Sequence, residues 1–216
     1  MNDKQLQDAV LAELAWEPSV VAAHVGVTAN AGVVTLTGHV ATYASKMDAA
    51  DAAARVKGVK AVAQEIEVKL PSDARRSDDD IAAAVIQRLS WDVSVPRDSV
   101  RIRVQSGWVT LTGEVEWFYQ KQGVADSVRR MFGVTGVSND ITLRTRVNTS
   151  NISDDIMRAL GRSWFFDPQT VSVTANGGRV TLNGSVHSFH DREVAAETAW
   201  GAPGTTDVEN HLAVVA

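Results

Sequence analysis

The chain has 216 residues, of which 44% are hydrophobic and 22% are charged, and its net charge at pH 7 is −5. These proportions are those of an ordinary soluble globular protein, and the negative charge argues against a general nucleic-acid binder. The sequence contains no cysteine, which excludes disulfides, cysteine-ligated metals and a thiol nucleophile.

The first predicted element is an amphipathic helix that begins within residues 1–8, without the apolar run of a secretory signal. No stretch approaches the roughly 18 apolar residues that a membrane-spanning helix needs. The sequence as given therefore predicts a cytoplasmic location, or a periplasmic one if a leader has been removed, and no transmembrane segment.

This first helix has apolar residues at Leu6, Val10 and Leu14, a spacing that places them on one face. Two strands with alternating apolar residues follow, joined by a turn at residues 30–32 whose glycine supplies the positive φ. A second helix is expected over about residues 43–57, and a third strand ends the unit.

The same order of elements recurs twice more along the chain. Val-Thr-Leu-Thr-Gly at residues 34–38 returns at 109–113 and, with asparagine for the second threonine, at 180–184. A repeat of this length is a small domain. One strand–helix–strand crossover in each unit predicts a three-stranded mixed sheet with both helices on its single apolar face, an α+β fold. The three αββαβ units are expected to span residues 1–70, 78–147 and 148–216.

A glycine-led segment follows the second helix of each unit, at residues 58–62, 133–137 and 204–208. Together with the Val-Thr-Leu-Thr-Gly strand, this layout resembles the BON domain, in three tandem copies that cover nearly the whole chain. The third copy departs from the pattern, because Thr205 stands where the others have valine. The resemblance implies an αββαβ fold and a role at phospholipid membranes or in bacterial osmotic and envelope stress. The shared residues are packing and turn residues, so they identify a fold better than a site.

No nucleophile–base arrangement is found, so the chain is predicted not to be an enzyme, and no cofactor is expected. His187 and His190 lie three residues apart beside Asp191, a spacing compatible with part of a metal site. The shortage of further ligands favours a solvated helix start instead, and no metal site is predicted. The acidic run at residues 78–80 is likewise interpreted as a helix start, capped by one of its own aspartates.

Positions that are unusual in one repeat are candidates for function. Trp117 stands where the other repeats have Thr42 and Ser188, both good helix caps, and loss of such a cap costs about 0.5–2 kcal/mol. With Tyr119 it is predicted to form an exposed aromatic pair, suited to a lipid headgroup layer or a protein interface. The alternative is a contact between repeats that buries the pair. Phe118, which has aromatic counterparts in both other repeats, is interpreted as a core residue.

A second set of residues follows from strand alternation in the middle repeat. If residues 100, 102 and 104 face the helices, Arg101 and Arg103 face outward. The same rule places Trp108, Arg144 and Arg146 on this outer face. Arginine forks suit phosphate and carboxylate groups, and no other repeat concentrates cations in this way.

Three interpretations of this cationic face remain open. It can bind lipid phosphate, with each basic residue contributing about 1 kcal/mol. It can bind single-stranded nucleic acid stacked on Trp108, although the net charge does not favour this partner. It can also pack against the third repeat, which carries 4 basic and 8 acidic side chains.

The sequence as a whole favours a non-enzymatic, stress-related accessory protein that binds an anionic phospholipid surface mainly through its second repeat. The alternative is a protein–protein interaction scaffold, with the basic face docked on a neighbouring repeat or on a partner. The sequence does not indicate an oligomeric state.

Overall fold

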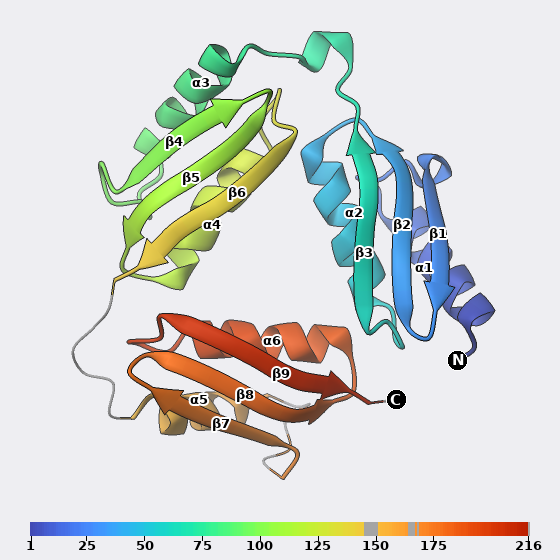
Figure 1. Ribbon diagram of the computed structural model, residues 1–216, viewed down its shortest axis with the longest axis vertical. Coiled ribbons are helices and arrows are strands. Elements are labelled where there is room, and N and C mark those ends of the chain that lie inside the picture. Colours follow the sequence, from blue (N-terminus) through green and yellow to red (C-terminus); the bar gives the residue numbers. More distant parts are fainter. Residues whose placement is uncertain (145–150, 164–166, 168, 216) are drawn as a thin grey trace.

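The computed structural model describes residues 1–144, 151–163, 167 and 169–215. Figure 1 shows three units of the same build, each with the element order helix, strand, strand, helix, strand. The helices are α1 (Asp3–Trp16), α2 (Tyr43–Arg55), α3 (Asp78–Ser90), α4 (Phe118–Arg129), α5 (Ile152–Leu160) and α6 (Phe189–Trp200). The strands are β1 (Val25–Asn30), β2 (Val33–Val40), β3 (Ala61–Val68), β4 (Val100–Gln105), β5 (Trp108–Val115), β6 (Gly136–Leu143), β7 (Val171–Asn176), β8 (Arg179–Val186) and β9 (Asp207–Val214). Two short 3-10 helices, η1 (Ala22–His24) and η2 (Ser72–Ala74), lie in loops.

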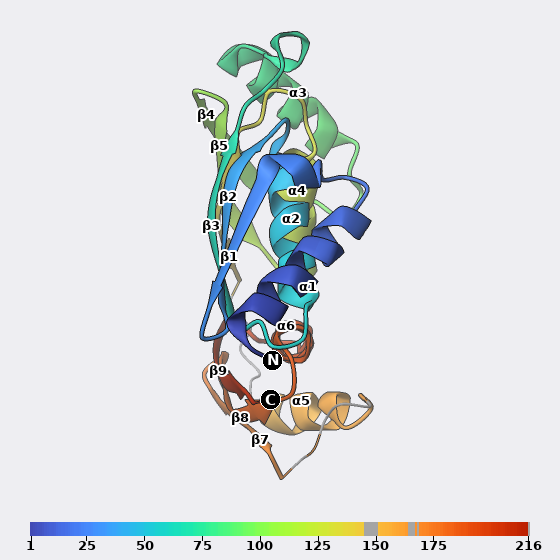
Figure 2. The same ribbon diagram turned by 90° about the vertical axis from the view of Figure 1, so that its right-hand side faces the viewer.

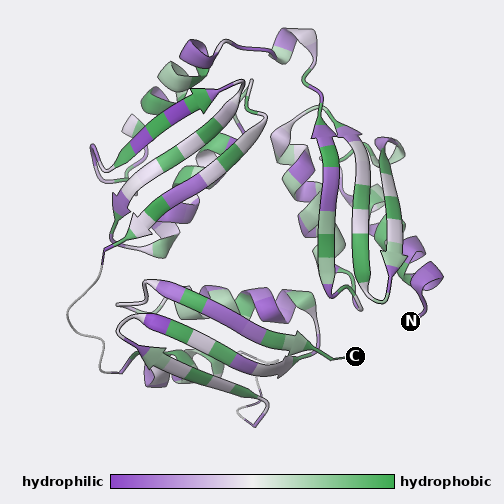
Figure 3. Cartoon of the chain, in the orientation of Figure 1, coloured by the Kyte–Doolittle hydropathy of each residue, from purple (hydrophilic) through white to green (hydrophobic). Residues whose placement is uncertain are grey.

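Each unit contains one three-stranded mixed sheet. The middle strand pairs antiparallel with the first strand and parallel with the third, with the same register in all three units. Along the strands hydrophobic and hydrophilic residues alternate (Figure 3), and the buried ones, such as Val34 and Leu36, face the two helices. The predicted α+β fold of three αββαβ units is therefore confirmed.

A side-chain amide ties the third strand to the second helix in every unit. Gln64 Nε2, Asn139 Nδ2 and Asn210 Nδ2 occupy equivalent positions, and each donates to a backbone carbonyl near the start of the second helix at 2.8–2.9 Å. Because this contact is repeated without change, it belongs to the framework and not to the function of one unit.

The start of α3 corrects one detail of the sequence prediction. Ser77, not an aspartate, caps this helix, since its Oγ accepts a hydrogen bond from the Asp80 backbone N–H at 3.1 Å. The Asp78 carboxylate instead accepts from the backbone N–H groups of Ser106 and Gly107, both at 2.8 Å. The acidic run thus joins the helix start to the β4–β5 turn.

The three units form a closed triangle (Figure 1). Helices α2, α4 and α6 lie toward its centre, and the N-terminal end of each lies near the C-terminal end of the next. Figure 2 shows that all three sheets face one side of the molecule and the helices the other. The first and third units, which no linker joins directly, touch through α2 and α6.

Aromatic residues at the start of the second helices connect neighbouring units. Tyr43, the first residue of α2, packs against the core of the second unit. Phe118, the first residue of α4, stacks on Trp200 of the third unit, with ring centroids 4.3 Å apart and an interplanar angle of 7°. The interpretation of Phe118 as a residue of its own core is corrected by this stacking, because its ring lies between two units.

Candidate anion-binding face of the second repeat

The outer face of the second sheet is an array of side chains in rows that cross β4, β5 and β6. One row contains Gln105, Trp108 and Gly136; the next contains Arg103, Thr110 and Ser138; the third contains Arg101, Thr112 and Asp140. The helices cover the opposite face, so these side chains point toward solvent. We refer to this array, with Glu114 and Arg144 beside it, as the arginine face.

Three of the four candidate arginines lie on the arginine face. Arg101 and Arg103 are exposed, and Arg103 donates from Nη2 to Gln105 Oε1 at 3.1 Å. Arg101 has no ion-pair partner among the residues that the structure describes. Arg144 Nε forms an ion pair with Glu114 Oε1 at 3.0 Å, and both side chains are largely exposed. An exposed pair of this kind contributes about 0–1 kcal/mol, so Arg144 can exchange its partner for a ligand. Arg146 lies outside the described residues.

Trp108 lies flat on the sheet next to these arginines. A Cβ placed on Gly136 would be only 2.3 Å from Trp108 Cε3, so the indole covers the glycine backbone directly. The indole Nε1 donates to Ser138 Oγ at 2.9 Å. The residue remains 49% exposed, which means that the outer face of the ring is open. The Trp108 ring therefore lies along the sheet in a fixed orientation and does not project from it.

The other two candidate aromatics do not lie on the arginine face. Trp117 and Tyr119 are at the start of α4, in the helix layer, where Trp117 is half-buried and Tyr119 is 60% exposed. The side chain of Gln120 bonds back to the start of the helix, since its Oε1 accepts from the backbone N–H groups of Glu116 and Trp117 at 3.1 and 3.0 Å. The two rings do not form an equally exposed pair.

One of the sequence alternatives is corrected by the position of the arginine face. The basic surface of the second repeat is not packed against the third repeat, because Arg101, Arg103 and Arg144 are exposed. The repeats dock through their second helices instead, and the acidic outer face of the third sheet points to the same side as the arginine face (Figure 2).

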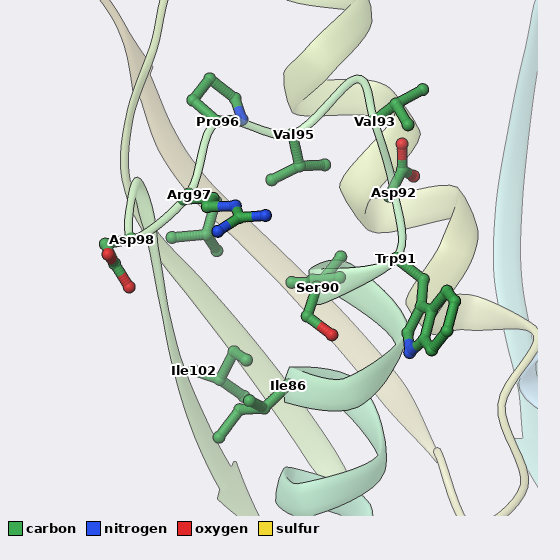
Figure 4. A pocket seen from close by; sticks show the side chains of 12 residues that line it. Ile86, Ser90, Trp91, Asp92, Val93, Val95, Pro96, Arg97, Asp98 and Ile102 are labelled. Atoms are coloured by element: carbon green, nitrogen blue, oxygen red, sulfur yellow. The ribbon is translucent and has the colours of Figure 1, made fainter.

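Sequence reasoning missed a second exposed surface in this repeat. Ile86, Trp91 and Val93 line a hollow of about 870 Å³ between α3 and the loop that leads to β4 (Figure 4). Trp91 is 82% exposed, and Trp16, at the equivalent end of α1, is 86% exposed. The recurrence of tryptophan 75 residues apart was the available signal. This hollow belongs to the helix layer and is separate from the arginine face.

Partial burial raises the pKa of two carboxyl groups on the helices α2 and α6. Burial raises the pKa of Asp51 on α2, and the nearby charge of Asp48 acts in the same direction, while Arg129 opposes it. Burial also raises the pKa of Glu193 on α6, and the charges of Asp51 and Glu197 add to this effect. Both groups belong to the helices that meet where the first and third units touch.

The part of the chain that the structure describes contains neither a metal-binding cluster nor a membrane-spanning helix. Within it, no three histidine and acidic side chains are grouped so that they could hold a metal ion. His187 and His190 are exposed at the start of α6. No helix within the described ranges is long and apolar enough to cross a membrane.

Comparisons with known proteins give a family match, a similar protein and a similar solved structure. The family model described as the BON domain matches residues 2–69, 77–145 and 148–216. The osmotically-inducible protein Y of Escherichia coli (strain K12) is 26% identical over 148 residues, which are 65% of this chain and 72% of that protein. Among solved structures, the C-terminal domain of CdsD, a structural protein of the type III secretion system of Chlamydia trachomatis, is 16% identical. Its TM-score is 0.28 with full coverage of both chains.

Proposed function

The chain belongs to the BON-domain family, with three tandem copies of the domain, and from this premise we propose that it binds anionic phospholipid surfaces through the arginine face of its second repeat. A family relative is an osmotically inducible protein, so a role in osmotic stress accompanies the proposal. The observation that carries it is the exposed pair Arg101 and Arg103, neither of which has an acidic partner among the residues that the structure describes.

On the equivalent faces of the other two repeats, Lys69 and Arg179 are paired with carboxylates. In the first repeat Lys69 pairs with Glu67 at 3.4 Å. In the third repeat Arg179 is held by Asp207 at 3.2 Å and by Glu209 at 3.6 Å. Lipid phosphates would have to displace these carboxylates, whereas Arg101 and Arg103 are already available. The second repeat is therefore the one suited to an anionic surface.

The strength of this interaction follows from the number of free cations. Each arginine near an anionic membrane contributes about 1 kcal/mol, so two or three of them give weak, reversible binding. Because the charges are exposed, added salt screens them over about 8–10 Å. Trp108 offers its open ring face at the level of the headgroups, where tryptophan is well accommodated. The expected behaviour is peripheral, salt-sensitive association.

A protein scaffold is the second candidate, and a different observation favours it. The hollow beside Ile86, Trp91 and Val93 exposes apolar side chains on the helix side, and such patches often mark a protein contact. The two candidates use opposite sides of the second repeat, so variants in each side distinguish them.

Vesicle flotation tests the proposal directly. The wild-type protein should float with vesicles that contain phosphatidylglycerol and not with phosphatidylcholine alone, and added salt should release it. Arg101→Ala/Arg103→Ala should reduce the partition coefficient about 30-fold, because two contributions of about 1 kcal/mol are lost.

Trp91→Ala is the matched control for this experiment, since it removes an exposed side chain from the helix side of the same repeat. If the arginine variant floats as well as the wild type while Trp91→Ala does not, the arginine face is not the binding surface. A salt series with a single-stranded oligonucleotide separates the nucleic-acid alternative, because phosphate contacts give a steep dependence of affinity on salt.

A further inference from the structure

A cavity of about 550 Å³ lies where the first and third repeats meet. Leu6 of α1 and Gly58, in the turn after α2, contribute to its wall from the first repeat. His187, just before α6, and Val214, at the end of β9, contribute from the third. A volume of this size is in the range of pockets that bind small molecules. The cavity is therefore a candidate site that exists only while these two repeats are docked.

The lining combines an apolar wall with unpaired positive charge. Met1 and Val214 offer apolar surface, with the buried Leu6 behind them, while Lys57, Lys60 and His187 supply basic groups. Both lysines are exposed, and neither forms an ion pair with any residue that the structure describes. The acidic residue in the lining is Asp3, whose carboxylate accepts the backbone N–H of Ala31 at 2.9 Å. The cavity is thus suited to a molecule with an apolar part and an anionic group.

The joint between the first and second repeats has a hollow of about 600 Å³ at the equivalent place. The hollow is lined by Val68, which is equivalent to Val214, and by Leu70, Arg75 and Arg76 of the linker. At that joint the chain itself provides apolar and basic side chains that run from one unit to the next. At the joint between the third and first repeats, no linker side chain is among the described residues that line the cavity.

We propose that this cavity binds a single-chain anionic amphiphile, whose head group meets Lys57, Lys60 and His187 and whose acyl chain lies against Met1 and Val214. The shared chemistry is a carboxylate or phosphate joined to one acyl chain, as in a free fatty acid or a lysophospholipid. Because such a ligand contacts both repeats, it binds the closed triangle more tightly than the open chain and shifts the population toward closure. This site is separate from the arginine face and does not depend on membrane binding.

Titration calorimetry with the full chain tests the site. Laurate below its micelle concentration should bind with one molecule per chain, whereas dodecanol, which lacks the charge, and inorganic phosphate, which lacks the acyl chain, should each bind at least tenfold more weakly. A lysophosphatidylglycerol titration shows which head group fits better. Equal binding of laurate and dodecanol, or of laurate and phosphate, would overturn the assignment, and so would the absence of laurate binding.

Two double variants separate this site from the arginine face. Lys57→Ala/Lys60→Ala should weaken laurate binding more than tenfold, while Arg101→Ala/Arg103→Ala, which also removes two exposed charges, should leave it unchanged. In the flotation experiment the effects should be reversed. Unchanged laurate binding in the lysine variant would contradict the cavity proposal without affecting the proposed membrane function.

Hydrogen–deuterium exchange reports on closure of the joint. Laurate should slow exchange in peptides from the end of α2 and the start of α6, and should leave the α3–β4 loop unaffected. Bound laurate that protects no peptide at this joint would contradict a ligand shared by the two repeats.

Discussion

The orientation of the Trp108 ring depends on Gly136, the residue opposite it on β6, which has no side chain. Gly136 allows the indole to lie against the β6 backbone, where Ser138 fixes its Nε1. In the first repeat the equivalent of Gly136 is Ala61, which faces the smaller Val33. The strand backbone therefore accepts a Cβ at this position, and the glycine is needed only because of the tryptophan opposite.

Gly136→Ala should consequently displace the indole without disturbing the sheet. The new Cβ would clash with the ring, and overpacking of this kind costs about 1 kcal/mol or slightly more at a site where the side chain can move outward. Thermal unfolding should show this small loss of stability, and a shift in tryptophan fluorescence should report the displaced ring. An unchanged spectrum would mean that the ring does not rest on the glycine. Ser138→Ala, which removes the hydrogen bond alone, is the matched comparison.

For single residues, the sequence predicted which side of the sheet a side chain faces, because this direction depends only on the local backbone. Strand alternation alone placed Arg101, Arg103 and Trp108 outward, because successive residues of a strand point to opposite faces. Strand alternation gave no prediction for Trp117, which is half-buried at the start of α4. What each of these residues binds stays a prediction.

At the scale of elements, the second helices determine how the units are joined. Helices α2, α4 and α6 meet head to tail (Figure 1), so the positive end of one helix dipole lies toward the negative end of the next. Phe118 and Trp200 provide the stacked contact at one joint. At the joint of α2 with α6, the carboxyl groups of Asp51 and Glu193 lie close enough for their charges to interact.

This joint should strengthen when the pH falls. Across this joint the charge of Asp51 helps to raise the pKa of Glu193, so the docked state binds protons more readily than the separated state. Docking is therefore favoured below the raised pKa values, and this advantage is lost as the pH rises through them. Around these groups lie Asp48, Arg55, Asp126 and Arg129 on one side and His190, Arg192 and Glu197 on the other.

Hydrogen exchange at the start of α6, followed as a function of pH after correction for intrinsic rates, checks this prediction. Protection should increase in mildly acidic solution for the wild type and should change less with pH for Asp51→Asn/Glu193→Gln. The same variant should be at least as well protected as the wild type at neutral pH, since it lacks the repulsion. Greater protection of the wild type at higher pH would give the opposite sign and refute the argument.

The sequence predicted the elements of each repeat but not these joints. Apolar spacing and turn glycines are properties of one unit, and they recur three times. Contacts between units depend on residues that differ among the repeats. Trp200, for example, corresponds to Arg129 and Ala54. That difference was visible in the sequence, but its partner could be identified only from the arrangement of the helices.

At the scale of the whole molecule, the common orientation of the sheets determines which sheet faces would contact a membrane together. All three outer faces point to one side (Figure 2), so a surface that approaches the arginine face also approaches the acidic third sheet. The carboxylates of Asp207 and Glu209 then repel anionic lipid and also hold Arg179. If the second repeat binds membranes as proposed, the third repeat would limit its affinity.

Neutralising these two carboxylates should increase membrane binding. Asp207→Asn/Glu209→Gln removes two repulsive charges and frees Arg179, and about 1 kcal/mol for each charge near the surface implies at least a several-fold gain in partition. Flotation with phosphatidylglycerol vesicles measures it, with Asp154→Asn/Asp155→Asn on α5 as a control of equal charge change on the helix side. An equal gain in both variants would show that net charge, and not the shared orientation of the sheets, is responsible.

The contact between the first and third repeats also affects how the protein could self-associate. Its two halves, the start of α6 and the end of α2, are different surfaces that fit each other, so an opened molecule presents both of them at once. Two opened copies can then exchange third repeats and close as a domain-swapped dimer, or continue head to tail as a chain. Within one chain the third repeat is held at a high effective concentration beside the first, which favours the intramolecular contact over exchange.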